Sequence, residues 1–405
     1  MLANALARLY ARIPLGMRLG LQPMREACAR FGHPERTFEA VHVAGTNGKG
    51  SVCAMVESIA RAAGKRTGMF TSPHLCRFAE RIQIAGEPLD DATLARTLER
   101  ALDGAPELSF FETATLAAFL AFRDARVDLA IVEVGIGGRL DATNVLPLPR
   151  AAAITRVALD HTDRLGPTLV DIAREKAGIA KPGLDLLLGP VSADVRAAID
   201  EVARSHSATT TEAGERAVAY VRIGVEGDFQ RDNARIAAEL GARIGAAPGA
   251  IERGLASVRW PGRLERVEAA LPGGQARSFL LDAAHNPDGA EALARHLRSL
   301  ETGPQEIALV FGTLGDKDWS AMLDLLAPVT ATRVYVAPQG GSRPGIDPAM
   351  LAGRHAGVTA PGVAAALERA SAGGDSLVVV AGSLVLVGEA RALLLGLPCD
   401  PPVAL

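Results

Sequence analysis

Short apolar segments alternate with helix-compatible segments along most of the chain. The apolar segments are nearly continuous in hydrophobic character, which is typical of strands buried on both faces of a parallel sheet. Strands and helices in such alternation indicate an α/β fold with right-handed crossovers. The predicted strands of the first part are Phe38–Ala44, Thr67–Phe70, Leu129–Val134, Ala151–Ala158 and Leu184–Leu188, and the predicted helices are Ser51–Ala63, Glu112–Asp124, Leu169–Ala180 and Ala193–Ser205.

A glycine-rich turn, Gly45 to Gly50, joins the first predicted strand directly to a predicted helix. Glycines let backbone N–H groups approach an anion closely, and the helix N-terminus adds unsatisfied donors and a favourable dipole. We expect Lys49 to bridge the outer phosphates of a nucleotide and Ser51 to face a magnesium ion. Because Gly50 separates Lys49 from Ser51, the spacing departs from the usual G-x-x-x-x-G-K-[ST]. An ordinary glycine turn is the alternative interpretation.

The alternation of strands and helices resumes after Pro261–Arg263. We therefore predict two domains. Residues 1–270 are expected to form a P-loop-type mononucleotide-binding domain with a mostly parallel sheet, and residues 271–405 a smaller Rossmann-like α/β domain. Its predicted strands are Ser278–Asp282, Ile307–Phe311, Arg333–Val336 and Ser376–Ala381, and its predicted helices are Asp288–Ser299, Trp319–Leu326, Val363–Ala370 and Leu384–Leu395.

The composition is that of a globular protein, with 48% hydrophobic and 22% charged residues among 405. A net charge of −3 argues against a general nucleic-acid binder. The four cysteines form no C-x-x-C pair, so we expect neither disulfides nor a zinc site and assign the chain to the reducing cytoplasm. Arg8 and Arg12 interrupt the N-terminal segment, so we predict neither a signal peptide nor a membrane span. A monomer is the default expectation.

Polar residues follow the predicted strands at the edge where open α/β sheets bind ligands. Ser72 follows the second strand, and Asp160 and His161 follow the fourth. Glu133 interrupts an otherwise apolar strand, and a carboxylate there must be paired or bound to a cation because burying it alone is costly. Magnesium is the natural cation beside a phosphate site. The alternatives are an ion pair between Glu133 and Arg139, and a helix-capping role for Asp160 and His161.

The sequence does not decide the roles of three further polar residues, Lys176, Asp282 and His285. Lys176, in the helical segment after His161, is by itself most consistent with a solvated surface lysine. Asp282 and His285 end a strand of the second block and are candidates for ligand contact, whereas a helix-capping role accounts for Asn286.

Taken together, these residues resemble the folylpolyglutamate synthase and dihydrofolate synthase family, within the Mur ligase superfamily. The matching motifs occur in family order and span nearly the whole chain. They are HVAGTNGKGS (42–51), TSPHL (71–75), FFETATLAAF (110–119), VEVGIGGRLDATN (132–144), LDHTD (159–163), REKAGI (174–179), PGRLE (261–265), DAAHNPDGA (282–290) and GTLGDKDW (312–319).

The resemblance implies an ATP-dependent amide ligase with a Mur ligase central-type domain followed by a glutamate ligase domain. In this family ATP phosphorylates a carboxylate, and the amino group of L-glutamate attacks the acyl phosphate, releasing ADP and phosphate. The acceptor is dihydropteroate, the glutamate tail of a reduced folate, or both. Lysine, magnesium and backbone donors suit the negative charge that develops on oxygen in both steps.

The resemblance also assigns roles to individual residues. Lys49, Lys176, His161 and His285 are expected to take part in catalysis, His285 on the face that meets glutamate. Lys176 matches a lysine that the family carboxylates on its side-chain nitrogen to bind a second Mg²⁺, which reverses the interpretation of it as a surface lysine. The ATP contacts would be Thr46, Asn47, Gly48, Lys49, Gly50, Ser51, Asn233, Arg263 and Asp282; the magnesium ligands Ser72, Glu133, His161 and Lys176; and the pterin-region contacts Ser109, Phe110, Phe111, Glu112, Leu140, Asp141 and Ala142.

The sequence departs from the family pattern at one dipeptide, and three other classes of protein are alternatives to this interpretation. Phe229-Gln230 stands where the family often has His-Gln, which affects only the fine geometry of the base pocket. A peptidoglycan-precursor ligase would carry a UDP-binding domain ahead of the glycine turn, and we expect none. A nucleotide-binding switch would not need the polar residues at the strand ends, and a dinucleotide oxidoreductase would need the G-x-G-x-x-G motif that Gly135–Gly138 lacks.

Overall fold

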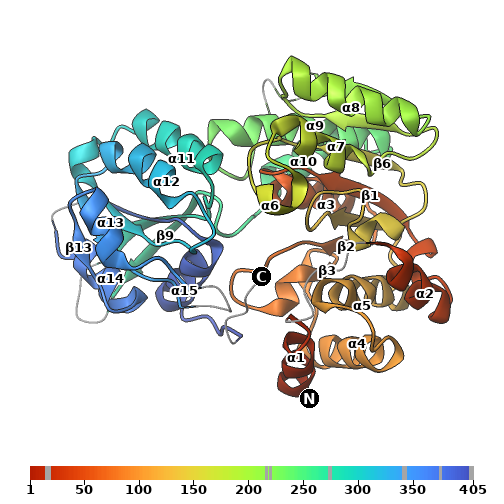
Figure 1. The fold of residues 1–405 in the computed structure, drawn as a ribbon, viewed down its shortest axis with the longest axis horizontal. Helices are drawn as coiled ribbons and strands as arrows, with labels where there is room; N and C mark the ends of the chain where they lie inside the picture. Colours follow the sequence, from red (N-terminus) through yellow and green to blue (C-terminus); the bar gives the residue numbers. More distant parts are fainter. Residues whose placement is uncertain are drawn as a thin grey trace. The chain divides into compact units, whose positions relative to one another are not determined.

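Two separate β-sheets organise the chain (Figure 1). A computed structural model describes residues 1–13, 20–214, 218, 221–271, 276–339, 344–373 and 376–400. No helix among these residues is long and apolar enough to cross a bilayer. The first compact unit comprises Met1–Pro73, Ala79–Gly224 and Gln230–Arg259, and the second comprises His74–Phe78, Val225–Phe229 and Trp260–Leu405.

The first unit is built on an eight-stranded sheet with the order β4-β3-β2-β5-β1-β6-β7-β8. The strands from β2 to β8 in this order are parallel, whereas β3 and β4 add antiparallel pairs at one edge. Because β1 lies between β5 and β6, its carboxyl end is at the centre of the sheet. The strands are β1 (Glu39–Ala44), β2 (Thr67–Phe70), β3 (Ile82–Ile84), β4 (Glu87–Pro88), β5 (Leu129–Glu133), β6 (Ala151–Ile154), β7 (Asp185–Leu188) and β8 (Thr209–Glu212).

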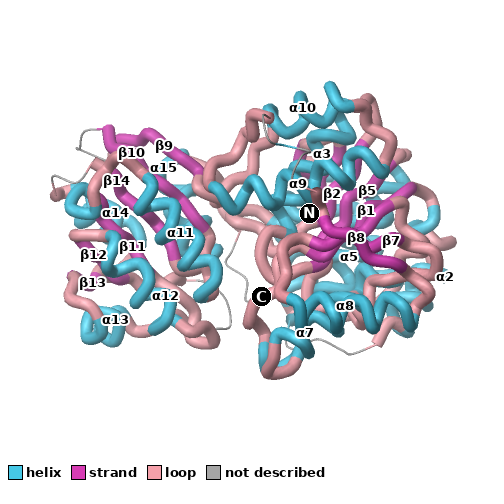
Figure 2. Tube along the Cα trace, turned by 90° about the horizontal axis from the view of Figure 1, so that it is seen from above, coloured by secondary structure: helices cyan, strands magenta, loops and turns pink. Residues whose placement is uncertain are grey.

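Helices cover both faces of this sheet, which explains why β2, β5 and β6 are buried along their whole length. Figure 2 shows α3, α9 and α10 on one face and α5, α7 and α8 on the other. The helices of this part are α1 (Leu2–Tyr10), α2 (Gln22–Arg30), η2 (Pro34–Arg36), α3 (Lys49–Ala62), η3 (Phe78–Arg81), α4 (Asp91–Gly104), α5 (Phe110–Asp124), η4 (Ala142–Val145), α6 (Thr162–Leu165), α7 (Leu169–Ala177), α8 (Ala193–Ser205), α9 (Asp228–Arg243) and α10 (Pro248–Ser257).

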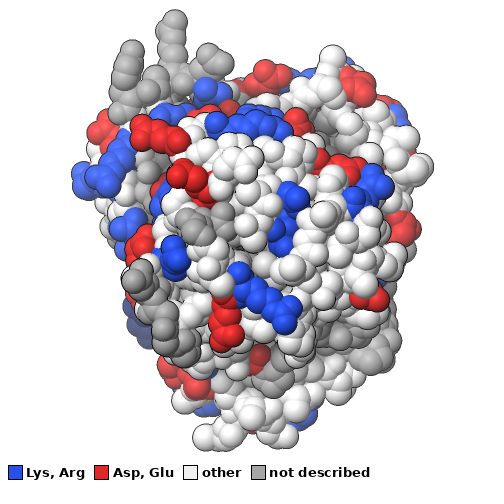
Figure 3. Space-filling view, turned by 90° about the vertical axis from the view of Figure 1, so that its left-hand side faces the viewer, with Lys and Arg blue, Asp and Glu red and all other residues white. Residues whose placement is uncertain are grey.

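The second unit has a six-stranded sheet with the order β13-β12-β11-β14-β10-β9, parallel except for the β9–β10 pair. One apolar cluster joins α11, α12 and α13 to one face, and a second joins α14 and α15 to the other. On the face displayed in Figure 3, basic and acidic side chains are intermixed among uncharged ones. The elements are β9 (Glu265–Ala270), β10 (Ala276–Asp282), α11 (Pro287–Ser299), η6 (Pro304–Glu306), β11 (Ile307–Phe311), α12 (Trp319–Leu326), η7 (Ala327–Val329), β12 (Thr332–Tyr335), α13 (Pro348–Arg354), β13 (Val358–Thr359), α14 (Val363–Ser371), β14 (Leu377–Ala381) and α15 (Leu384–Leu395).

The predicted α/β class and its two mostly parallel sheets are confirmed. Two element ends differ from the sequence prediction by three residues or more. The strand expected over Ala151–Ala158 ends at Ile154, because the backbone beyond it turns to bond with the glycine-rich loop. The helix expected over Leu169–Ala180 ends at Ala177, where Gly178 follows as its C-cap.

Candidate active site

The glycine-rich loop follows β1 at the centre of the first sheet and is held by the segment after β6. The Thr46 backbone N–H donates to the Arg156 carbonyl at 2.6 Å, and the Thr46 hydroxyl donates to the Ala158 carbonyl at 3.0 Å. The Thr155 hydroxyl donates to the Asn47 carbonyl at 2.7 Å. These bonds hold the loop from one side, so the loop is fixed before any ligand binds. Thr155 was not singled out in the sequence, because a threonine after an apolar run carries no distinctive signal.

Gly48 is the N-cap of α3 and has a left-handed backbone, with φ at 89°. A Cβ atom at this position would lie 2.4 Å from Oδ1 of Asn233, on α9. The Asn233 amide donates to Gln230 Oε1 at 2.9 Å, and the Gln230 amide donates to the Ser51 hydroxyl at 3.3 Å. The structure therefore brings the predicted nucleotide residues Gly48, Ser51 and Asn233 together, and adds Gln230 as their link.

Lys49 and Glu133 meet beside the loop. The Lys49 ammonium lies 3.9 Å from Glu133 Oε1 and donates to the Thr46 carbonyl at 3.1 Å. Glu133 is buried, and its Oε2 accepts from the backbone N–H of Ser72 at 3.0 Å. The alternative ion pair between Glu133 and Arg139 is wrong, because the Arg139 guanidinium pairs with Glu175 at 2.8 Å. A lysine, a carboxylate and the predicted Ser72 thus surround one end of the loop.

Lys176 is buried, which excludes the solvated surface lysine that its sequence alone suggested. Its ammonium donates to the carbonyl of Gly45, the first residue of the glycine-rich loop, at 3.0 Å. Burial, and to a smaller extent the positive charge of Lys49, lower the pKa of Lys176 to about 7, against the opposing effect of the Asp160 and Asp141 carboxylates. The neutral amine is therefore accessible near neutral pH.

His161 is a half-buried residue with a left-handed backbone, at φ 51°, immediately before α6. Its backbone N–H donates to Asp160 Oδ1 at 2.9 Å, and its Nε2 lies 3.9 Å from the same oxygen. The helix-capping alternative is confirmed only for the position of His161, which is the N-cap residue of α6. Its side chain makes no capping hydrogen bond. Left-handed backbones at non-glycine residues are costly and concentrate at functional sites.

The residues predicted for the pterin region divide into two groups. Ser109 and Glu112 form the capping box of α5, with the Ser109 N–H and hydroxyl both donating to Glu112 Oε2, at 2.8 and 2.7 Å. Glu112 is buried, and its carboxylate caps the start of α5. The Phe111 ring is half-buried and packs against Gly135, where a Cβ atom would lie 2.4 Å from the ring. Phe110 is buried beneath the Arg81 guanidinium, which lies 5.2 Å from the ring centroid.

The loop after β5 carries the other predicted pterin-region residues. Asp141 is buried and is the N-cap of η4. Its carboxylate accepts from the Ile136 N–H at 2.9 Å and from the Thr143 N–H and hydroxyl at 3.0 and 2.5 Å. Burial raises the pKa of Asp141, while these donors oppose the shift. Leu140 is half-buried and Ala142 is buried beside it.

In the second unit, Asp282 ends β10 and is buried. It accepts from the Leu264 and Ala284 N–H groups, both at 3.0 Å, and burial raises its pKa while the Arg263 charge opposes the rise. The Arg263 guanidinium donates to the Ala283 carbonyl at 3.1 Å, next to Asp282 in the chain. His285 is half-buried, with Nδ1 2.9 Å from the same Ala283 carbonyl. The capping role expected for Asn286 is confirmed, since its side chain accepts from the Gly289 N–H.

The residues beside the loop suit a magnesium ion that arrives with a nucleotide. Among the described residues, no three His, Cys, Asp or Glu side chains gather in a way that could hold a metal by themselves. Glu133 supplies one buried carboxylate next to the loop. Mg²⁺ bound with nucleotides takes one or two carboxylates and completes its coordination with phosphate oxygens and water. The donor set therefore fits a nucleotide-bound metal better than a permanent metal centre.

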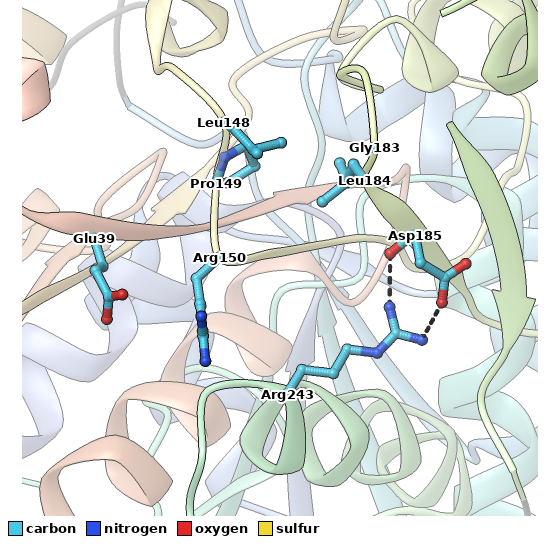
Figure 4. A pocket seen from close by; sticks show the side chains of 8 residues that line it. All are labelled: Glu39, Leu148, Pro149, Arg150, Gly183, Leu184, Asp185 and Arg243. Atoms are coloured by element: carbon cyan, nitrogen blue, oxygen red, sulfur yellow. Dashed lines mark hydrogen bonds and ion pairs between the residues drawn. The ribbon is translucent and has the colours of Figure 1, made fainter. Parts of the chain in front are cut away.

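A hollow of about 620 Å³ lies at the opposite edge of the first sheet (Figure 4). Glu39 and Asp185, the first residues of β1 and β7, line it together with Arg150, which precedes β6. The Arg243 guanidinium donates to the Asp185 carbonyl at 2.6 Å and to its carboxylate at 2.8 Å (Figure 4). The hollow is therefore at the amino ends of the strands, whereas the glycine-rich loop follows a carboxyl end.

Two family models match the chain. The Mur ligase middle domain matches residues 43–234, and the Mur ligase glutamate ligase domain matches residues 262–384. A folylpolyglutamate synthase from Lacticaseibacillus casei is 33% identical over 408 residues, covering 90% of this chain and 92% of that protein. A dihydrofolate synthase/folylpolyglutamate synthase from Mycobacterium tuberculosis is 35% identical, covering 90% of this chain and 87% of that protein.

A longer relative is a Haloferax volcanii protein named a probable bifunctional folylpolyglutamate synthase/dihydropteroate synthase, 34% identical over 92% of this chain. The chain spans about half of it, 48% of its length. Among solved structures, Escherichia coli FolC in complex with DHPP and ADP has a TM-score of 0.87 at 30% identity and covers 98% of both chains. A bifunctional folylpolyglutamate synthase/dihydrofolate synthase with Mn, AMPPNP and L-glutamate bound has a TM-score of 0.85 at 31% identity and covers 97% of this chain and 98% of its own.

Proposed function

This chain belongs to the folylpolyglutamate synthase/dihydrofolate synthase family of Mur ligases, and on that basis we propose that it is an ATP-dependent amide ligase. It would join L-glutamate to dihydropteroate, to the glutamate tail of a reduced folate, or to both, with release of ADP and phosphate. The observation that carries the proposal is the convergence of Lys49, Glu133 and Lys176 on the glycine-rich loop.

The loop and the start of α3 would hold the ATP phosphates. Backbone N–H groups at the N-terminus of α3 would bind a phosphate anion, and Lys49 would add a positive charge beside them. Asn233 and Gln230 fix the position of Ser51, so that its hydroxyl stays at the helix start. Lys49 would stabilise the negative charge that develops on the transferred phosphoryl group, because a fixed cation in a largely buried site needs no reorganisation.

Ser72, Glu133 and His161 would hold Mg²⁺, and Lys176 would help to hold a second one after carboxylation. The bound ions would supply charge neutralisation for the phosphoryl transfer. Carboxylation requires a neutral amine, since Nζ attacks the carbon of CO₂ and releases a proton to form the carbamate anion. A pKa of about 7 provides that amine at neutral pH. The hydrogen bond from Nζ to Gly45 keeps the nitrogen aimed at the loop.

Phe111 and the loop from Leu140 to Ala142 would contact the acceptor substrate. The Phe111 ring supports this role, because it is only half-buried and so keeps apolar surface on which a planar heterocycle could pack. The roles of Arg263 and Asp282 with nucleotide, and of His285 with glutamate, stay predictions from the sequence.

The test is ADP release by the purified protein with magnesium-ATP and L-glutamate. Dihydropteroate and tetrahydrofolate are supplied in separate reactions, beside a control without any pterin. Turnover with both acceptors would assign both activities, and turnover with one would identify the acceptor. ADP release that is the same with and without a pterin would overturn the proposal in favour of a nucleotide hydrolase or switch.

A further inference from the structure

A chain of buried hydrogen bonds runs from β1 to the loop after β5. His42, in the middle of β1, is fully buried, and its Nε2 lies 2.8 Å from the Thr143 hydroxyl. The same hydroxyl lies 2.5 Å from Asp141 Oδ1. Thr143 is fully buried as well, and Asp141 nearly so. Three polar side chains therefore connect the central strand to a loop through a region otherwise closed to solvent.

The direction of each hydrogen bond follows from the number of protons available. The Asp141 carboxylate can only accept, so the single Thr143 hydroxyl proton is donated to Oδ1. The hydroxyl oxygen must then accept from His42, which places the imidazole proton on Nε2. Burial lowers the pKa of His42 to about 3, so the ring stays neutral. His42 Nδ1 has no hydrogen-bond partner among the described residues, and this tautomer leaves the unpaired position an acceptor rather than a buried N–H group.

The chain ends on the carboxylate that organises the loop. Asp141 Oδ2 accepts from the Ile136 N–H at 2.9 Å, which ties the end of the loop to its beginning. Gly135, next to Ile136, contacts the Phe111 ring. The Asn144 amide donates to the Arg139 and Gly178 carbonyls, both at 3.0 Å, so the loop is also fixed to the end of α7. A displacement of Asp141 would therefore also displace the surface formed by Phe111 and residues 140–142.

A purely structural core would fill this space more simply with apolar side chains, because each buried polar group must be desolvated. A connected polar chain instead fixes the rotamer of each member. We propose that His42 and Thr143 are positioning residues that set the Asp141 carboxylate and, through it, the loop that receives the acceptor substrate. This inference rests on the proposed function, which assigns that loop to the pterin-bearing acceptor. Neither residue is expected to touch the substrate.

The first experiment compares Thr143→Val with Thr143→Ser. Valine has nearly the same shape but no hydroxyl, whereas serine keeps the hydroxyl. We expect Thr143→Val to raise KM for the pterin acceptor roughly tenfold with KM for ATP changed less than about twofold, and Thr143→Ser to stay near the parent. Equal losses for ATP and acceptor, or equal behaviour of the two variants, would overturn the positioning role.

The second experiment tests whether His42 acts through Thr143. His42→Leu should raise the acceptor KM, and His42→Gln, which keeps an N–H donor near the Nε2 position, should restore part of the loss. In the double variant His42→Leu/Thr143→Val, the acceptor KM should match that of Thr143→Val alone, because both changes break the same chain. If the increases in acceptor KM of the two single variants instead multiply in the double variant, His42 acts by another route and the proposal is overturned.

A third measurement does not depend on activity. Nitrogen-15 NMR of the histidine side chains, with His42 assigned by its loss in His42→Gln, should show a neutral Nε2–H tautomer that does not titrate between about pH 5 and 8. The Nδ1–H tautomer, or protonation within that range, would overturn the hydrogen-bond chain whatever the substrate. Failure of the proposed function would be recognised separately, because the parent protein itself would then show no acceptor-dependent ADP release.

Discussion

Replacing Gly48 with alanine is expected to destabilise the first unit and to weaken ATP binding. Gly48 has φ 89°, and the new Cβ would lie 2.4 Å from Asn233 Oδ1. The left-handed backbone alone costs alanine about 1–2 kcal/mol. Moving Asn233 also breaks its bond to Gln230 and disturbs the bond from Gln230 to Ser51, which adds about 1–3 kcal/mol. The free energy of unfolding should therefore fall by about 2–5 kcal/mol, the sum of these two ranges.

Gly64→Ala is the matched control. Gly64 has nearly the same backbone, at φ 83°, and lies just beyond the other end of α3, but a Cβ added there would meet nothing within 4 Å. The free energy of unfolding of Gly64→Ala should fall only by the backbone contribution, about 1–2 kcal/mol. The difference between the two variants isolates the contact with Asn233.

The assay is urea unfolding followed by far-ultraviolet circular dichroism, together with ATP titration calorimetry. Trp260 and Trp319, the two tryptophans of the chain, belong to the second unit. Their fluorescence therefore gives an internal control that should change little in either variant. ATP affinity should fall at least about tenfold in Gly48→Ala and stay near the parent in Gly64→Ala. Equal stability and equal ATP affinity of the two variants would refute the role given to Asn233.

Three further predictions concern charged groups. Lys49→Ala should lose roughly 10²–10³ in turnover, whereas Lys65→Ala, which removes a lysine paired with Glu39, should not; near-normal turnover of Lys49→Ala would remove it from the mechanism. Lys176→Ala should regain activity when short carboxylic acids are added, and the absence of rescue would leave its carboxylation unsupported. Burial raises the pKa of Glu389 from 4.5 to about 7, so the folded state binds more protons than the unfolded state between these values, and stability should fall as pH rises through this window. Tryptophan-monitored unfolding at pH 5 and 8 should show a smaller fall for Glu389→Gln; an equal fall would contradict the assignment.

The glycine-rich loop could be predicted from the sequence because its parts are contiguous. Strand, glycine turn and helix follow one another, and each local pattern agrees with the fold. The apolar runs of β5 and β11 were equally clear, since both strands are buried on both faces. β9 was missed because it is an edge strand whose residues alternate between exposed and buried, with Glu265, Arg266 and Glu268 among them.

The rest of the site depends on contacts between residues far apart in the chain. The bond from Gln230 to Ser51 joins residues 179 positions apart, and the bond between His42 and Thr143 joins residues 101 positions apart. No local pattern reports such pairs. Lys176 looks like a surface lysine within its own helix, because the loop that buries it comes from another part of the sheet. Burial of a polar side chain is a tertiary property, and only the family resemblance pointed to it.

The shortness of one edge strand in each sheet bears on whether another chain can add a strand there. β4 and β13 have only two residues each, and Pro88 in β4 lacks a backbone N–H group. An edge strand with free N–H and C=O groups is a template on which another chain can add a strand, and short or proline-containing edges remove that template. Extending either edge with a run of β-branched residues is therefore a direct route to fibrous aggregation, even if the active site is untouched.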